Sequence, residues 1–461
     1  MFDFAIIGSG VSGGKIAQDL TLGGAKCLLI EAGKEYQANT FPKHELDYSS
    51  QMFWGGGLEI STDGKIGFLR ARCLGGTSVV NQALLDRFDR LAFDEWKKIS
   101  GISFFTEKEM APYYKAIESS LAISPIPERF YNKNAKLFIS AFDQLGYQWS
   151  PLKRAQTDCK WEKGSDCIVC LGGCPRNSKQ SALVTTIKKA RENGLHIETG
   201  FEVDQLIHTH DKVLILGTQN GTRKQFTVAK IVLAAGSIGN SSILLRSGFG
   251  KKLPWIGKNF CCHPQFMTYA FFEELIDAHK GPFQAVKSDD VKLRRSGYKF
   301  ENVFAPPIGT AMLLPGFGKN HLLNMKSYRY MASMEVAIRD SSKGSITLDK
   351  NGDIKIQKKL TPSDWKKAKE GLLLVKEFFE SVKAKKIIPC MQKFGLHLMG
   401  GCAIGTNPEH SVVNPNFQVH HHSNIFIADS SIFPSAPGIN PSLTIMALSH
   451  KAAQKILDEK F

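Results

Sequence analysis

Three glycines near the start of the sequence have the spacing of a dinucleotide-binding turn. Gly8, Gly10 and Gly13 follow a short apolar run, and they open a helical pattern that includes Ser12. The first glycine permits a tight turn, the second lets the backbone approach a pyrophosphate, and the third lets the helix pack against the strand. The amides and the positive dipole end of that helix would face the phosphates. Glu31 ends the next apolar run, where a carboxylate can accept hydrogen bonds from a ribose diol. The alternative is a glycine-rich turn without a ligand.

Four of the ten cysteines lie close together, at Cys159, Cys167, Cys170 and Cys174. A chain in a reducing compartment keeps its thiols free, so the cluster first predicts a metal or redox site. The C-x2-C-x3-C-P core is typical of iron–sulfur binding runs. A structural zinc site, a disulfide pair and a loop with incidental cysteines remain alternatives.

Three polar residues in the last quarter of the chain are further candidates. His397 stands among apolar residues, where a lone histidine is more often part of a satisfied core than catalytic. Asn440 precedes Pro441, and this pair is a helix-start signal in which the asparagine would be the N-cap. Asp429 ends a short apolar strand and could simply form the turn there.

Small residues are also concentrated in two internal turns. In each, a structural turn and a loop pressed against a ligand are both consistent with the composition. The second follows the buried strand pattern 231–233 and leads into a helical pattern over 238–246. The residues singled out are Gly75, Gly76, Ser78 and Asn81 in the first turn, and Ala235 and Gly236 in the second.

Composition indicates a large globular protein. The chain has 461 residues, of which 43% are hydrophobic and 22% charged, and this length predicts two domains. The net charge of +16 is spread along the chain, and no nucleic-acid-binding motif accompanies it, so we expect no nucleic-acid partner. Attraction to an anionic membrane surface or an acidic partner stays open. No apolar run predicts a membrane span, and a strand pattern that begins at once predicts cytoplasmic synthesis, with export on a partner left open.

In their order and over nearly the whole chain, these motifs resemble those of the glucose-methanol-choline (GMC) family of flavin oxidoreductases. The last two are similar to those of the cholesterol-oxidase-like branch, in which a histidine before Gly-Gly-Cys is paired with an Asn-Pro dipeptide. The matching segments are 8–13 with Glu31, 75–81, 234–248, 257–264, 397–402 and 427–445.

The resemblance implies roles for individual residues. His397 matches the catalytic base, and Asn440 would hydrogen-bond the substrate oxygen while the helix after Pro441 points at the flavin. Asp429 would lie near the ribityl and phosphate region of FAD, and the glycine turns with Val203, on a predicted strand over 203–208, would bind the same cofactor. Arg70 occupies the position of the histidine that binds flavin covalently in some members, so non-covalent FAD is expected. Some family dehydrogenases carry an iron–sulfur cluster where this chain has its cysteines.

The expected fold is α/β, with a Rossmann-like FAD-binding domain and a second α+β substrate domain built on an antiparallel sheet. We place the first domain at 1–88, 176–264 and 396–461, and the second at 89–175 and 265–395 with the Cys-rich loop 159–174. The expected reaction is oxidation of a small-molecule alcohol, with electrons passed through a candidate cluster to an electron-accepting protein or small subunit. The alternatives are an oxidase that releases hydrogen peroxide and a flavin-bound subunit without catalysis.

Overall fold

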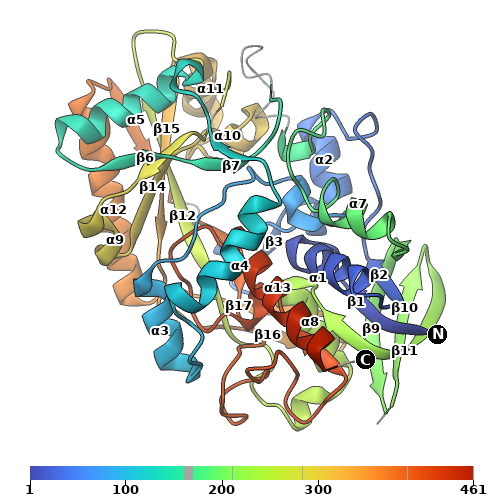
Figure 1. Ribbon diagram of the computed structural model, residues 1–461. Coiled ribbons are helices and arrows are strands. Elements are labelled where there is room, and N and C mark those ends of the chain that lie inside the picture. Colours follow the sequence, from blue (N-terminus) through green and yellow to red (C-terminus); the bar gives the residue numbers. More distant parts are fainter. Residues whose placement is uncertain (160–169, 210, 283, 392, 460–461) are drawn as a thin grey trace.

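The computed structural model describes residues 1–159, 170–209, 211–282, 284–391 and 393–459. Two β-sheets lie beside each other in this part of the chain, and helices cover them (Figure 1). Both termini lie at the sheet that is formed by the start of the chain (Figure 1). The two sheets carry separate hydrophobic cores.

The first sheet has seven strands among the described residues, in the order β8-β2-β1-β11-β10-β9, with β20 also paired to β11. The pairs β8–β2, β2–β1, β1–β11 and β11–β20 are parallel, whereas β10 pairs with β9 and β11 in antiparallel fashion. The strands are β1 (Phe2–Ile7), β2 (Cys27–Glu31), β8 (His196–Thr199), β9 (Phe201–His208), β10 (Val213–Gln219), β11 (Thr222–Leu233) and β20 (Ile425–Ile427).

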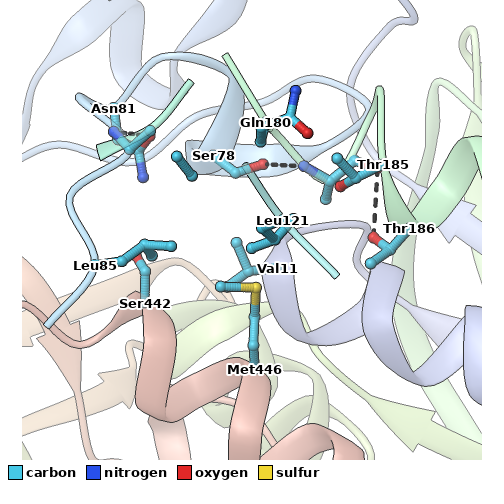
Figure 2. Close-up of a pocket in the computed structure, with 13 residues that line it drawn as sticks. Val11, Ser78, Asn81, Leu85, Leu121, Gln180, Thr185, Thr186, Ser442 and Met446 are labelled. Atoms are coloured by element: carbon cyan, nitrogen blue, oxygen red, sulfur yellow. Dashed lines mark hydrogen bonds between the residues drawn. The ribbon is translucent and has the colours of Figure 1, made fainter. Parts of the chain in front are cut away.

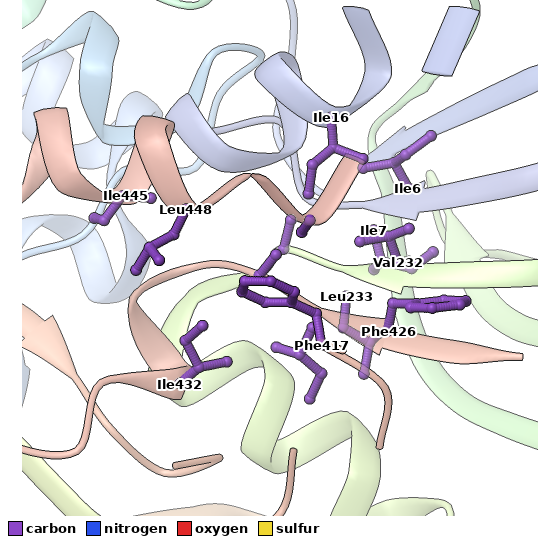
Figure 3. Close-up of a cluster of buried hydrophobic side chains, with 14 of the residues drawn as sticks. Ile6, Ile7, Ile16, Val232, Leu233, Phe417, Phe426, Ile432, Ile445 and Leu448 are labelled. Carbon is purple, nitrogen blue, oxygen red and sulfur yellow. The ribbon is translucent and has the colours of Figure 1, made fainter. Parts of the chain in front are cut away.

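Helices α1 (Val11–Leu22) and α13 (Ser442–Asp458) pack against each other and against this sheet. Figure 3 shows their apolar faces meeting the central strands, with Ile16 above Ile6 and Ile445 beside Leu448. All four side chains are buried, and complete burial of such a side chain contributes about 1.5–3 kcal/mol. The start of the chain and its last helix therefore share one core.

The second sheet has eleven strands among the described residues and is mostly antiparallel, with one parallel pair between β19 and β4. Its main path is β3-β4-β19-β12-β15-β14-β13-β6; β16 and β18 pair with β12, and β17 pairs with β16. The strands are β3 (Glu59–Ile60), β4 (Ile66–Phe68), β6 (Trp149–Pro151), β12 (Lys258–Phe271), β13 (Val286–Ser288), β14 (Tyr298–Asn302), β15 (Met331–Ile338), β16 (Gly344–Leu348), β17 (Ile354–Gln357), β18 (Lys386–Pro389) and β19 (Lys393–Met399). A small separate pair is formed by β5 (Ile123–Pro125) and β7 (Lys153–Ala155).

Helix α12 begins with a capping box and packs on β15 together with α5. Helix α4 begins after Thr106, whose side chain accepts from the amide of Glu109. The remaining helices are α2 (Glu45–Met52), α3 (Arg90–Ser100), α4 (Glu107–Ser119), α5 (Lys133–Gln144), α7 (Thr186–Arg191), α8 (Gly236–Arg246), α9 (Val291–Ser296), α10 (Pro307–Leu313), α11 (Gly318–Lys326) and α12 (Pro362–Ser381). Short 3-10 turns connect several of them, among them η2 (Gly76–Val79) and η5 (Cys170–Gly172).

This architecture confirms the expected fold class, an α/β Rossmann-like sheet beside a mostly antiparallel one. The domain boundaries stay a prediction, and strands β3, β4 and β19 pair into the second sheet although they lie wholly or largely in segments assigned to the first domain. The sequence pattern over 181–192 predicts a longer helix than the structure has, because only Thr186–Arg191 is helical. Within the described ranges, no helix has the length and apolar character needed to cross a bilayer.

Candidate functional site

The turn between β1 and α1 is built by close backbone packing. Gly8 has φ +98°, and a Cβ there would overlap the carbonyl of Ala234 at the end of β11. A Cβ on Gly13 would overlap the carbonyl oxygen of Gly8, so the helix can approach the strand only with glycine at this position. A Cβ on Gly10 would meet no atom within 4 Å. The turn is therefore closed against β11 and open beside Gly10.

Open space beside Gly10 coincides with free donors. Gly10 is the N-cap of α1 and provides no side-chain cap, and the amides of Val11, Ser12 and Gly13 have no acceptor within the described part of the chain. The Ser12 hydroxyl donates to the carbonyl oxygen of Ala428 at 3.1 Å, so it faces the end of β20 instead. Three unpaired amides at the positive end of a helix dipole suit an anionic group such as a pyrophosphate.

Glu31 is buried at the end of β2 and is held by the neighbouring loops. Its carboxylate accepts from the Ser9 amide at 3.1 Å, the Ser9 hydroxyl at 2.5 Å and the Gly33 amide at 2.8 Å. Burial raises its pKa, and these hydrogen bonds oppose the rise. A carboxylate has about four acceptor positions, so one stays available for a ribose hydroxyl.

Val203 is buried on β9, near the same end of the sheet. The amide of Gly200, just before β9, donates to the carbonyl oxygen of Gly33 at 2.9 Å. This bond places the start of β9 beside the loop that follows Glu31. Val203 thus lies on an element that could meet the same end of an elongated cofactor.

The turn with Gly75 and Gly76 lies directly on the turn between β1 and α1. A Cβ on Gly76 would meet the Cα of Gly10 at 2.8 Å, and the Gly75 amide donates to the Ser9 hydroxyl at 2.9 Å. Ser78 donates to the Gly75 carbonyl at 2.6 Å and accepts from the amide of Ala182 at 2.9 Å. The small residues of this turn are therefore required for close approach to the first turn.

A pocket continues from these turns to the start of α13 (Figure 2). Val11 from α1 and Met446 from α13 point toward each other in its centre, with Ser442 and Asn81 at one side (Figure 2). The Asn81 side chain accepts from the Ala83 amide at 2.9 Å. Residues from the first turn of α1 and the first turn of α13 thus line one pocket.

Asp429 connects β20 to the turn before α8. Its carboxylate accepts from the Gly236 amide at 2.7 Å, the Asn240 side chain at 2.9 Å, and both the amide and hydroxyl of Ser431 at 2.8 and 2.6 Å. Asn240 also accepts from the Ala235 amide at 2.9 Å. Burial raises the pKa of Asp429, against the effect of these hydrogen bonds. Asp429 therefore holds the turn between β11 and α8 in place.

These features fit an elongated dinucleotide such as FAD. The open space beside Gly10, the unpaired amides of α1 and the buried Glu31 suit the ADP half of the molecule. The pocket in Figure 2 leads from there toward α13, where a flavin ring would lie. Arg70 forms a two-pronged ion pair with Glu59 at 2.5 and 2.8 Å and lies over the ring of Trp54.

His397 lies in a β-bulge on β19. The register between β12 and β19 shifts between Cys261 and His263, so β19 has one extra residue there. His397 has φ +57°, a conformation that non-glycine residues adopt rarely and often at functional sites. Bulges re-aim side chains. Burial, and then the nearby charge of Lys299, lower the pKa of His397 to about 4, so the imidazole is neutral near pH 7.

His263 on β12 joins His397 to the loop before α13. Its Nδ1 lies 3.0 Å from Nδ1 of His397, and its Nε2 accepts from the amide of Gly438 at 2.8 Å. The two rings meet edge to face at a centroid distance of 5.1 Å. His263 is 2% exposed, so no water competes for its two ring nitrogens.

Four consecutive carbonyl groups of that loop are each fixed by a side chain from another element. The acceptors are the carbonyl oxygens of residues 434–437. Their donors are the side chains of Asn259 at 2.7 Å, Trp96 at 3.1 Å, Arg339 at 3.1 Å and Arg294 at 2.8 Å. These contacts hold the loop in one path up to Gly438, and they therefore also fix the position of Asn440 two residues later.

Asn440 does not act as the predicted N-cap. Helix α13 begins at Ser442, the cap position is Pro441, and no side-chain capping bond is present. The Asn440 side chain instead donates to Glu301 Oε1 at 3.5 Å. Asn440 is buried, and its amide faces β14 rather than the helix.

Glu301 on β14 is the centre of a buried polar cluster beside Asn440. It pairs with Lys299 at 2.6 Å and accepts from Gln284 at 2.5 Å. Glu335 lies directly opposite Glu301 on β15, and burial together with the Glu301 charge raises the pKa of Glu335 well above its usual range. The raised pKa favours the protonated form of Glu335, which allows two carboxyl groups to share one buried place.

His263, Glu301 and Glu335 were not found from the sequence. The segment 257–264 matches a family motif without indicating a role for His263, and the two glutamates lie in strands without a recognisable pattern. The acidic residues in β14 and β15 could have indicated a functional cluster, because strands that are buried on both faces rarely carry acids.

Of the four clustered cysteines, Cys159, Cys170 and Cys174 are described and Cys167 lies outside the described residues. A hydrogen bond from Cys170 is the main factor that lowers the pKa of Cys174 to about 5, with help from the amide of Lys179. Cys174 is thus a thiolate at neutral pH. In the described ranges, no group of three or more His, Cys, Asp or Glu residues is arranged to hold a metal ion.

Comparison with protein families gives two matches, both to models described as GMC oxidoreductase. They cover residues 49–265 and 340–449. Among characterised and uncharacterised proteins, the chain is similar to the uncharacterised GMC-type oxidoreductase y4nJ of Sinorhizobium fredii, with 27% identity over 99% of this chain and 94% of that protein. It is also similar to the long-chain-alcohol oxidase FAO4B of Arabidopsis thaliana, with 25% identity over 99% of this chain and 67% of that protein.

Among solved structures, the chain is similar to pyridoxine 4-oxidase from "Mesorbium loti". The TM-score is 0.73 at 17% identity, and the match covers 98% of this chain and 99% of the other. At this identity the likeness is one of fold. It agrees with the two-sheet architecture described above.

Proposed function

The chain belongs to the GMC oxidoreductase family, and on this basis we propose that it oxidises an alcohol to a carbonyl compound with non-covalently bound FAD. The single observation that supports the proposal most is the link through His263, which ties the bulge with His397 to the loop before Asn440. His397 and Asn440, which can both hydrogen-bond a substrate oxygen, are thereby held near the start of α13. When bound there, FAD supplies a flavin ring that accepts a hydride.

The chain's own residues would hold the substrate oxygen. Asn440 donates from its amide, and His397 reaches the site as a neutral imidazole because its pKa is about 4. The N-terminus of α13 adds a positive dipole end without a side-chain cap, which favours negative charge on a reduced flavin. The family resemblance implies that His397 is the proton acceptor, a role that requires a lone pair on its Nε2.

The electron acceptor is a second part of the proposal. We favour an external acceptor, with a cluster held by Cys159, Cys167, Cys170 and Cys174, because the thiolate at Cys174 is in the state that metal ligands require. The alternative, use of oxygen, is supported by the names of two similar proteins, the long-chain-alcohol oxidase and the pyridoxine 4-oxidase.

Anaerobic reduction tests the reaction. The FAD-loaded protein is mixed with primary and secondary alcohols of increasing chain length, and flavin absorbance is followed before and after oxygen is admitted. Bleaching by an alcohol is the expected result. Fast reoxidation with release of peroxide would assign oxygen as acceptor, and absence of bleaching with every alcohol class would contradict the proposed reaction.

Iron and acid-labile sulfide measured in anaerobically purified protein test the cluster. We expect both in wild type and loss of both in a Cys170→Ser variant. Cys390→Ser is the matched control, since Cys390 is equally buried but lies far along the chain. Full FAD loading without iron in wild type would contradict the cluster.

A further inference from the structure

An exposed apolar surface lies on the second sheet's side of the molecule, on α10 and α11. Figure 1 places both helices at the upper edge, far from the two termini. Five large side chains are exposed within sixteen residues: Ile308 by 37%, Met312 by 59%, Phe317 by 91%, Leu322 by 55% and Leu323 by 50%. We call these five residues the α10–α11 patch. Apolar side chains that are exposed singly are ordinary, but a group of this kind marks an interaction site.

Phe317 is presented at the tip of a tight turn. Gly316 and Gly318 on either side have φ +106° and +61°, and a Cβ on either would meet no atom within 4 Å. Helix α11, which begins directly after Phe317, has no buried residue. The turn therefore projects its aromatic ring outward, away from the rest of the chain.

The frame beneath the patch is nevertheless held firmly. The amides of Ile308 and Gly309 donate to the Glu45 carboxylate at 2.9 and 2.5 Å, and the Tyr328 hydroxyl donates to the Ala305 carbonyl at 2.8 Å. Leu314 between the two helices is buried in the core of the second sheet. The patch therefore lies on a well-held part of the chain rather than on a loosely attached loop.

Within the segment that carries the patch the charges are of one sign, and the nearby Glu45 carboxylate is already bonded to the amides of Ile308 and Gly309. No aspartate or glutamate occurs between Glu301 and Glu335, whereas Lys319 and Lys326 flank the exposed leucines. Neither lysine has an acidic partner among the residues that the structure describes. The acids of the adjoining loop are already paired, Glu274 with Lys133 at 2.7 Å and Asp277 with Arg329 at 2.7 Å.

We propose that the α10–α11 patch docks the protein on an anionic lipid bilayer. An aromatic tip with leucines beside it inserts at the boundary of headgroups and acyl chains, and free lysines at its edge meet lipid phosphates. A protein partner of matching acidity would need to cover a projecting tip rather than a flat or concave face, so the bilayer fits the shape better. The proposal does not depend on the identity of the substrate or of the electron acceptor.

Vesicle co-sedimentation of the FAD-loaded full chain tests it. Vesicles of phosphatidylcholine alone are compared with vesicles that contain phosphatidylglycerol, at low and high salt. We expect binding to the anionic vesicles, weakened by salt, and at least tenfold weaker binding for Phe317→Ser and for Lys319→Glu combined with Lys326→Glu. Leu22→Ser and Lys350→Glu are matched controls, because both residues are exposed and lie outside the patch and its frame.

Two results would overturn the proposal. One is equal sedimentation with and without anionic vesicles. The other is a wild-type dimer in solution that Phe317→Ser separates into monomers without any change in vesicle binding, which would assign the patch to a second copy of this chain.

A different observation, the pair His263 and His397, carries a second inference that bears on the proposed reaction. Nε2 of His263 accepts a hydrogen bond from the Gly438 amide, so this nitrogen carries no proton. A neutral imidazole has one proton, which must then be on Nδ1 of His263. That proton points at Nδ1 of His397, 3.0 Å away, and Nδ1 of His397 must accept it.

We infer that His263 is a positioning residue that fixes His397 with its proton on Nε2. The neutral His397 then offers an N–H, not a lone pair, on its free side. It would meet a substrate oxygen as a hydrogen-bond donor in the resting enzyme. This contradicts a base at Nε2, so one measurement decides between the two assignments.

Nitrogen-15 NMR of the FAD-loaded protein with labelled histidine makes that measurement without any substrate. The His397→Gln spectrum identifies the His397 signals. We expect a pyrrole-type shift for Nε2 and a pyridine-type shift for Nδ1 in wild type. A pyrrole-type Nδ1 in wild type would overturn the inference, whatever the variants do.

Two substitutions at His263 add a control for folding. An amide places an acceptor and a donor at a spacing like that of the two ring nitrogens, so His263→Gln can keep both hydrogen bonds, whereas His263→Leu keeps neither. We expect wild-type-like His397 shifts and turnover within about threefold for the glutamine variant, and averaged shifts with at least tenfold lower turnover for the leucine variant. Unchanged His397 shifts in a folded leucine variant would contradict the positioning role.

Discussion

At the scale of single residues, His397 combines several marks of a reacting group. Its φ is positive, it sits in a bulge, and its ring has one defined partner at Nδ1. A histidine that served only the core would need neither the backbone strain nor the bulge. Both features therefore favour the role proposed for His397 in the reaction.

Replacement of His397 by alanine should separate chemistry from cofactor binding. Because the FAD-binding turns contain no contact to this residue in the described structure, we expect full FAD loading and an unchanged melting temperature within a few degrees. We expect turnover to fall by about 10²–10⁴, the usual contribution of a proton-handling side chain. Stopped-flow flavin reduction measures the loss, and a rate within threefold of wild type would contradict the assignment.

The pKa of His397 predicts the acid limb of the pH profile. Burial first and the Lys299 charge second lower this pKa to about 4, so the imidazole stays neutral from pH 5 upward. If the neutral ring is the active form, kcat/KM should be level across pH 5–7 and decline only near pH 4. Measurement of kcat/KM in overlapping buffers checks this, and a decline centred at the ordinary histidine value of about 6.5 would contradict it.

At the scale of elements, two glycines of one turn have different tasks, and substitution distinguishes them. A Cβ on Gly13 overlaps the Gly8 carbonyl within the folded chain, whereas a Cβ on Gly10 meets nothing. We expect Gly13→Ala to lower the free energy of unfolding of the apoprotein by roughly 2–4 kcal/mol. Gly10→Ala should leave that free energy nearly unchanged and weaken FAD binding at least roughly tenfold, because its methyl group would occupy the place of the pyrophosphate.

Urea unfolding of the apoproteins and FAD titration measure the two effects. Leu22→Ala is a suitable control for handling, since Leu22 is 52% exposed and lies at the other end of α1. Equal effects of Gly10→Ala and Gly13→Ala on both quantities would contradict the division of tasks.

The same elements explain what the sequence could and could not predict. The turn with Gly8, Gly10 and Gly13 was predictable because the chain requires glycine at fixed spacing within one short segment. The cluster around Glu301 was not, because its members meet through strand pairing between residues far apart in sequence. The helix predicted from Ser181 begins late, since hydroxyl groups in 181–185 bond to nearby backbone, for example Thr185 to the Ser181 carbonyl at 2.7 Å.

At the scale of the whole molecule, one segment ties the two sheets together by charge. Three acids in residues 86–95 each pair with a base from the second sheet or the elements beside it. Asp86 binds Lys287 at 2.6 Å and Lys299 at 3.4 Å, Asp89 binds Arg294 at 2.8 Å, and Glu95 binds Arg339. Arg294 and Arg339 also hold the loop before Asn440, so the relative position of the sheets and the geometry of the site share the same contacts.

This link should make stability depend on acid pH. Burial raises the pKa of Asp86, but Lys299 and Lys287 outweigh it and bring the pKa below the ordinary 3.8. A carboxylate whose pKa is lower in the folded state stabilises the fold above the unfolded pKa, and this contribution is lost as the pH falls through the folded pKa.

We expect Asp86→Asn to lower the free energy of unfolding by roughly 2–4 kcal/mol at pH 7, because it leaves two lysines without their partner. The difference from wild type should shrink below about pH 4. Urea unfolding at pH 7 and at pH 3.5 measures this difference. Asp94→Asn is the control, because Asp94 pairs with Arg90 on the exposed side of α3. An exposed ion pair of this kind contributes about 0–1 kcal/mol. A difference between Asp86→Asn and wild type that is the same at both pH values would show that the carboxylate acts through its shape rather than its charge.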